Sequence, residues 1–149
     1  MGMKACLDTN VFISVKNKEP DAPYCERILD AIDDNKIQGV ISTIVLAEVL
    51  VGFYQSNETP EADRFLNHAI LQYEIIPVNV EISKNAAVIR GTMQIKLPDA
   101  LISATATFAK ADFLITNDIP LTKKIKYQIV TPQKFMETYL QVTPKNNAE

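Results

Sequence analysis

The chain has 149 residues, of which 47% are hydrophobic and 22% charged, with 18 acidic and 15 basic side chains. This is the length of one domain, and the hydrophobic content excludes a disordered chain. The formal net charge of −3 argues against a nucleic-acid partner, because phosphate-binding domains usually display a basic excess. Net charge, however, describes the whole surface and not a site.

The histidine and cysteine content argues against a zinc protein. His68 is the only histidine, and Cys6 and Cys25 lie far apart without a CxxC motif. Both cysteines read as reduced core thiols, and with no signal segment at the amino terminus we expect a cytoplasmic protein. The longest apolar stretch, residues 39–54, is shorter than the roughly 20 residues of a membrane helix and contains Glu48, so no membrane span is expected.

Short apolar strands alternate with helical patterns along the chain. We predict strands over residues 4–8, 39–42, 73–78, 112–116 and 127–130, and helices over 22–34, 43–53, 59–70, 80–93, 100–109 and 132–140. The alternation predicts an α/β fold, a three-layer sandwich with a mainly parallel central sheet of four to five strands covered by helices. We expect one domain over residues 1–141 and a flexible tail at 142–149.

Two segments carry expectations of their own. The segment after the first strand is polar and contains Pro20 and Pro23, and no element is predicted before the helix that begins at residue 22. The helix over residues 43–53 is apolar on nearly all sides, which indicates a helix buried against the sheet.

Four acidic residues lie in apolar surroundings. Asp8 and Asp118 each end a predicted strand, and Asp99 begins the apolar helix that follows Pro98. Each of these three has an ordinary structural explanation as a turn residue or a first-turn acid. Glu48 is harder to explain, because an ionised carboxylate in a buried helix is costly without a partner. Since the carboxyl ends of parallel strands share one edge, the four could converge there.

Converging carboxylates need compensation. Two of them about 4 Å apart repel by roughly 4 kcal/mol at an effective dielectric near 20, so a cluster requires protons or a metal ion. Oxygen ligands without histidine or cysteine favour Mg²⁺ or Mn²⁺. The chemistry that fits is metal-assisted hydrolysis of a phosphodiester.

The segments around these acids resemble the four acidic motifs of PIN-domain nucleases, most closely the VapC-type toxins of toxin–antitoxin pairs. They are LDTNVFIS (7–14), AEVLVG (47–52), LPDALISATA (97–106) and LITND (114–118). The resemblance implies a Mg²⁺- or Mn²⁺-dependent endoribonuclease acting on single-stranded RNA. It also implies a parallel sheet between helices, a homodimer, and an antitoxin protein whose tail covers the acidic site.

The resemblance also assigns roles to individual residues. Asp8 and Asp99 would ligate the metal directly, Glu48 directly or through water, and Asp118 would ligate or orient a water. Asn10 and Thr116 match positions that support the ligands by hydrogen bonds. Ser103 stands where many members have alanine. The residues after Asp118 lack the further acid and aromatic that many members have, so the number of metal ions, one or two, stays open.

Other readings stay open at this point. The chain could be a PIN-type RNA-processing nuclease without an antitoxin, or a non-catalytic module that binds RNA or protein. A phosphatase pattern is disfavoured because Asn10 stands where its general acid is required. Lys123, Lys124 and Lys126 could hold substrate phosphates or form a solvated basic loop, and the salt dependence of RNA binding in a triple alanine variant would separate these.

Overall fold

The structure, a computed structural model, describes residues 2–118, 121, 125 and 128–140. Its centre is a five-stranded sheet in the order β3-β2-β1-β4-β5 in which every neighbouring pair is parallel. The strands are β1 (Lys4–Leu7), β2 (Gln38–Ser42), β3 (Tyr73–Ile76), β4 (Phe113–Ile115) and β5 (Ile129–Val130). The predicted α/β fold with a parallel sheet is confirmed. The predicted tail at 142–149 lies outside the described residues.

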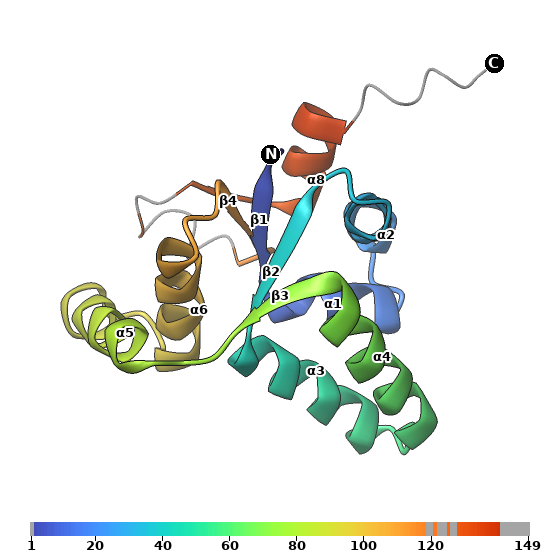
Figure 1. Cartoon of the computed structure of the whole chain (residues 1–149), viewed down its shortest axis with the longest axis horizontal. Coiled ribbons are helices and arrows are strands. Elements are labelled where there is room, and N and C mark those ends of the chain that lie inside the picture. The colour runs from blue at the N-terminus through green and yellow to red at the C-terminus, as the bar shows by residue number, and fades with distance from the viewer. Residues whose placement is uncertain (1, 119–120, 122–124, 126–127, 141–149) are drawn as a thin grey trace.

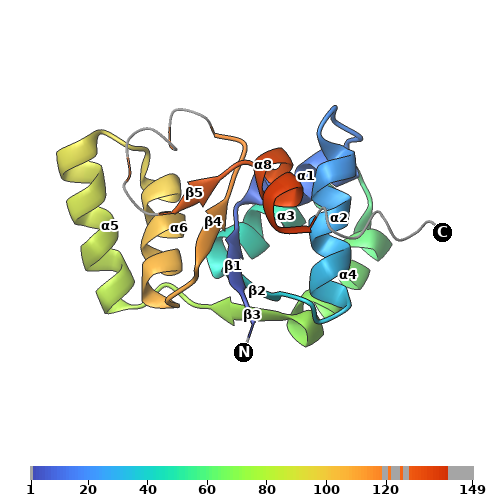
Figure 2. The same cartoon turned by 90° about the horizontal axis from the view of Figure 1, so that it is seen from above.

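Helices lie on both sides of the sheet. They are α1 (Thr9–Lys16), α2 (Ala22–Asp33), α3 (Thr43–Gln55), α4 (Thr59–Gln72), α5 (Val80–Met93), α6 (Leu97–Phe108) and α8 (Pro132–Phe135), which continues as the π-helix η1 (Met136–Leu140). In Figures 1 and 2, α6 lies on one side of the sheet with α5 outside it, and α1, α2 and α8 lie on the other. Helices α3 and α4 pack beside β2 and β3. Over the described ranges, none of these helices combines the length and apolarity that crossing a membrane requires.

Helix α1 is an element that the sequence pattern did not predict. Asp8 caps it by accepting a 2.7 Å hydrogen bond from the Thr9 backbone N–H. Val11 and Phe12 then enter the core, where the Phe12 ring meets Phe65 edge-on at 5.4 Å between centroids. The helix therefore begins directly at one of the four acids and holds it at the end of β1.

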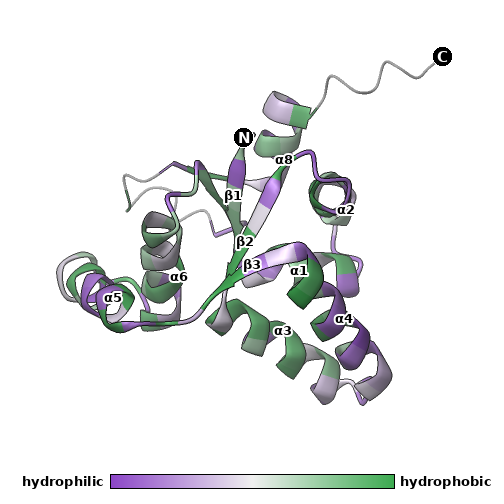
Figure 3. Ribbon diagram, viewed as in Figure 1, coloured by the Kyte–Doolittle hydropathy of each residue, from purple (hydrophilic) through white to green (hydrophobic). Residues whose placement is uncertain are grey.

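Helix α3 is less buried than its composition predicts. It is hydrophobic along most of its length (Figure 3), but only Val45 and Val49 are buried. The side chains of Val51 and Tyr54 are 49% and 50% exposed. The predicted burial against the sheet applies to one face only, because α3 packs on β2, α1, α4 and α6 and leaves its remaining face open.

The order of the strands reverses at β1. From β1 the chain adds β2 and β3 on one side of the sheet, and it adds β4 and β5 on the other. The ends of β1 and β4 are joined by a 3.0 Å hydrogen bond from the Asp8 backbone N–H to the Ile115 carbonyl. Open α/β sheets bind ligands at the carboxyl ends of the strands where the order reverses, so the fold places Asp8 at the expected position for a site.

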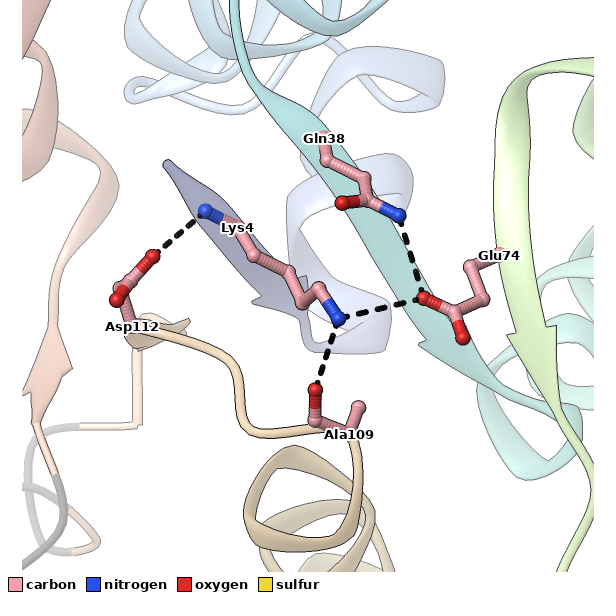
Figure 4. Close-up of polar contacts among 5 residues, drawn as sticks. All are labelled: Lys4, Gln38, Glu74, Ala109 and Asp112. Carbon is pink, nitrogen blue, oxygen red and sulfur yellow. Dashed lines mark hydrogen bonds and ion pairs between the residues drawn. The ribbon is translucent and has the colours of Figure 1, made fainter. Parts of the chain in front are cut away.

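The opposite, amino-terminal edge of the sheet is fastened by polar contacts around Lys4 (Figure 4). Lys4 Nζ donates to the Ala109 carbonyl at 2.9 Å and lies 3.7 Å from the Glu74 carboxylate. The Lys4 backbone N–H donates to Asp112 at 2.8 Å, and Gln38 donates to Glu74 at 3.3 Å. These part-exposed contacts contribute little energy singly, but they join three strands and the turn before β4 at the edge away from Asp8.

Candidate functional site

Asp8 is the most enclosed of the four acids, with 5% of its surface exposed. Its Oδ1 accepts the Thr9 N–H, and its Oδ2 accepts the Thr116 hydroxyl at 2.6 Å and the Asn10 side-chain amide at 3.3 Å. The two residues predicted to support the ligands, Asn10 and Thr116, therefore contact this carboxylate directly. These bonds fix its orientation at the end of β1.

Asp118 reaches the same edge from the segment after β4. Its backbone N–H donates to the Thr116 hydroxyl oxygen at 3.0 Å, and its Oδ1 accepts the Leu121 N–H at 3.1 Å. Thr116 thus bonds Asp8 through its proton and Asp118 through its oxygen. The Asn117 N–H donates to the Asn10 side-chain oxygen at 3.1 Å, which adds a second link between the ends of β1 and β4.

Asp99 lies in the first turn of α6, directly after Pro98, and is half-buried. Among the described residues, no hydrogen bond or ion pair holds its carboxylate. Burial raises the pKa of Asp99, the charges of Asp118 and Glu48 raise this pKa further, and Lys96 lowers it. The carboxylate of Asp99 is therefore close enough to Asp118 and Glu48 for their charges to act on it. With no partner among the described residues, it is available to bind a ligand.

The predicted burial of Glu48 is wrong. This residue was expected inside a buried helix, but it lies on the open face of α3 and is exposed. Because Glu48 is exposed, its charge does not require a partner. What joins Glu48 to the site is a hydrogen bond from the Thr9 hydroxyl to its Oε1.

The electrostatics of Asp8 complete the connection between the four acids. Burial raises the pKa of Asp8 to about 6, and the charges of Asp99 and Glu48 raise it as well, while the hydrogen bonds from Thr116 and Thr9 lower it. The charges of Asp99 and Glu48 thus raise the pKa of Asp8, and the charge of Asp118 raises the pKa of Asp99. The structure brings all four predicted acids to one edge of the sheet.

The donor set fits a hard divalent cation in chemistry but is not a closed metal site. Carboxylate oxygens without histidine or cysteine are the ligands that Mg²⁺ and Mn²⁺ prefer. Within the part of the chain that the structure describes, no three or more His, Cys, Asp or Glu residues are arranged so that they could hold one ion. The acids are neighbours that an ion could recruit, and the ligand roles assigned to them remain predictions.

Three residues that the sequence did not single out also contribute to this edge. Thr9 contacts Asp8 and Glu48, and the Asn117 side-chain amide donates to the Asp21 carboxylate. A hollow of about 420 Å³ opens here, and its lining includes Asn10, Asp21 and Asn117. No sequence signal marks Asp21, because its contact depends on how the turn before α2 meets the end of β4. The predicted phosphate-binding residues Lys123, Lys124 and Lys126 lie outside the described residues.

These features define a class of protein, an α/β domain with a parallel sheet and interacting carboxylates at its carboxyl-terminal edge. The chain belongs to the PIN-domain family, because residues 5–124 match the PIN domain. The resemblance to this family that the four motifs indicated is confirmed. Comparison with curated protein sequences finds no match.

Several solved structures are similar to this chain over most of its length. One is VapBC2 from Rickettsia felis bound to a promoter DNA fragment, with 27% identity, a TM-score of 0.69, and coverage of 87% of this chain and 98% of that chain. Another is a toxin–antitoxin complex from Klebsiella pneumoniae, with 28% identity, a TM-score of 0.65, and coverage of 86% and 97%. FitAcB from Neisseria gonorrhoeae has 21% identity, a TM-score of 0.70, and coverage of 87% and 98%, a likeness that shows the fold alone.

Proposed function

We propose that this PIN domain is a metal-dependent endoribonuclease that hydrolyses phosphodiester bonds in single-stranded RNA. The observation that carries the proposal is the environment of the buried Asp8 carboxylate. The negative charges of Asp99 and Glu48 repel it, and it forms no ion pair with any described residue. Such an arrangement costs free energy in the folded protein unless a cation or a proton relieves it. A divalent cation that binds these carboxylates would remove this free-energy cost, and the bound ion could then contact a phosphate of the RNA.

Each acid has a role in this proposal. Asp8 and Asp99 would bind Mg²⁺ or Mn²⁺ directly, Glu48 directly or through water, and Asp118 would bind the ion or orient a water. When bound, the ion would activate water and neutralise charge that develops on the phosphate. Thr116 and Asn10 keep the Asp8 oxygens oriented toward the site.

The chain has no histidine available as the base. His68, its only histidine, lies on α4 and its ring bonds the Asp33 carboxylate at 2.8 Å. Proton transfer from the attacking water therefore falls to the site carboxylates, of which Glu48 is exposed, Asp99 and Asp118 are half-buried, and Asp8 is buried.

We further propose that the nuclease is the toxin of a toxin–antitoxin pair. Two similar structures support this: the toxin–antitoxin complex from Klebsiella pneumoniae at 28% identity, and VapBC2 from Rickettsia felis at 27% identity. The similarity extends over nearly the whole length of both of those chains. The expected partner is an antitoxin protein that covers the acidic edge, and the expected assembly is a homodimer.

The Asp99→Asn variant tests both parts. It removes one charge without a hydrogen bond or ion pair among the described residues, so the chain should stay folded. At Mn²⁺ concentrations about 100 times its Kd, the wild-type protein should gain roughly 5–10 °C in melting temperature, and the variant should gain much less. Expression of the wild-type chain alone should arrest growth, and expression of the variant should not.

Two outcomes would contradict these proposals separately. Equal stabilisation of both proteins by Mn²⁺, or none in either, would contradict the metal site at Asp99. Normal growth of cells that express the folded wild-type chain would contradict the toxin assignment while leaving the nuclease proposal intact.

A further inference from the structure

Thr9 is the residue that connects Asp8 with Glu48. Its backbone N–H donates to Asp8 Oδ1 at 2.7 Å, and its hydroxyl donates to Glu48 Oε1. The other hydrogen-bond donors to Asp8, which are Asn10 and Thr116, form no bond with Glu48 in the described part of the chain. One residue thus contacts two of the four acids through two different groups.

Glu48 needs such a contact more than the other acids. It is exposed on α3, and a glutamate side chain has three rotatable bonds, so fixing it in one position costs conformational entropy. The backbone under it is already fixed, because α1 and α3 pack closely at Gly52, where an added Cβ would lie 3.1 Å from Ile13 Cδ1. The remaining freedom is in the side chain, and Thr9 is the group that restricts it.

We propose that Thr9 is a positioning residue that holds the Glu48 carboxylate beside Asp8 before a divalent cation arrives. This inference rests on the proposed metal site. The hydroxyl occupies Oε1 of Glu48, which leaves Oε2 without a partner among the described residues and available to an ion or to an ion-bound water. Removing the hydroxyl leaves the backbone bond to Asp8 in place, so the effect should be confined to Glu48.

The test compares Mn²⁺ affinity, measured by calorimetric titration, in the wild type and five variants. Thr9→Val removes the hydroxyl and keeps the branched shape, and it should bind Mn²⁺ about 10-fold more weakly than the wild type. Thr9→Ser restores a hydroxyl and should bind nearly as tightly as the wild type. Thr59→Val is the matched control, because Thr59 is also the first residue of its helix, is exposed, and should leave the affinity unchanged.

The last two variants, Glu48→Ala and Glu48→Ala combined with Thr9→Val, separate positioning from a structural role. In a Glu48→Ala background, Thr9→Val should cause no further loss of Mn²⁺ affinity, because the group it positions is gone. Melting temperatures measured with EDTA show that each variant is folded. Unchanged affinity in Thr9→Val, or an equal loss in the Glu48→Ala background, would overturn the role of Thr9 and leave the metal site standing. No Mn²⁺ binding by the wild type would overturn both.

Discussion

At the scale of single residues, Asp8 carries the largest electrostatic cost in the site. Burial raises its pKa to about 6, and the neighbouring charges of Asp99 and Glu48 act in the same direction. The hydrogen bonds from Thr116 and Thr9 offset only part of this. The folded protein without metal therefore holds an ionised Asp8 at neutral pH against an unfavourable free energy, as is common where function and not stability selects a residue.

The Asp8→Asn variant should be more stable than the wild type in the absence of metal. Asparagine removes the buried charge and keeps an oxygen for the Thr9 N–H, but its amide replaces an acceptor with a donor beside the Asn10 amide and the Thr116 hydroxyl, which offsets part of the gain. At pH 7.5 with EDTA we expect the free energy of unfolding to rise by about 1–3 kcal/mol, measured by urea denaturation.

The pH dependence of this gain has a defined sign. Because the folded-state pKa of Asp8 is raised above its unfolded value, its contribution to stability is present below about pH 4 and is lost as the pH rises through about 6. The difference in the free energy of unfolding between Asp8→Asn and the wild type should therefore be smaller when the measurement is repeated at pH 4.5. A variant that is less stable than the wild type at pH 7.5 would contradict this account of Asp8.

The positions of the acids are more predictable from the sequence than their surroundings are. Asp8, Asp99 and Asp118 follow from local pattern, because each lies at a strand end or helix start that the apolar periodicity marks. The burial of Glu48 was mispredicted, since an apolar helix indicates burial only if every face has a neighbour. Thr9 was missed because its contact with Glu48 depends on the packing of α1 against α3 and not on any local signal.

At the scale of elements, the same distinction holds. The strands and most helices were predictable because their apolar periods are bounded by proline, glycine and polar residues. Helix α1 was not, since Pro20 and Pro23 made the whole segment look irregular although the helix ends at Lys16, before either proline. Of the strand predicted over 127–130, the described part of the chain shows β5 at Ile129–Val130, and residue 127 lies outside the described residues.

The contact between β2 and β3 offers a test of packing at this scale. Gly39 pairs with Tyr73 in the parallel register, and a Cβ at Gly39 would lie 2.7 Å from the Tyr73 ring. That ring cannot move freely, because Tyr73 is 7% exposed and packs edge-on against Phe12 at 5.6 Å. We expect Gly39→Ala to lower the free energy of unfolding by about 1–3 kcal/mol, measured by urea denaturation.

Gly91 provides the matched control for that variant. It lies on α5, and a Cβ added there would meet nothing within 4 Å. Gly91→Ala should leave the protein as stable as the wild type or raise its stability by up to about 1 kcal/mol, because alanine favours a helix more than glycine does. If Gly39→Ala proved as stable as Gly91→Ala, the close approach of β2 and β3 would be wrong.

At the scale of the whole molecule, topology explains how acids separated in sequence come together. The reversal of strand order at β1 places the ends of β1 and β4 side by side, and α6 and α3 bring Asp99 and Glu48 to the same edge. In the proposed function, four of the 18 acids form the metal site, and one bound divalent cation would change the formal charge from −3 to −1. An acidic net charge is therefore compatible with an RNA substrate when the acids are gathered into one site.

The most direct test of the proposed function is to incubate the purified protein with short single-stranded RNA and DNA oligonucleotides and to map the cuts. With Mn²⁺ or Mg²⁺, the wild-type protein should cut RNA internally, EDTA should stop the cutting, and the folded Asp99→Asn variant should cut at most about a hundredth as fast. Cutting that persists in EDTA, or a folded Asp99→Asn variant that cuts RNA at the wild-type rate, would contradict it.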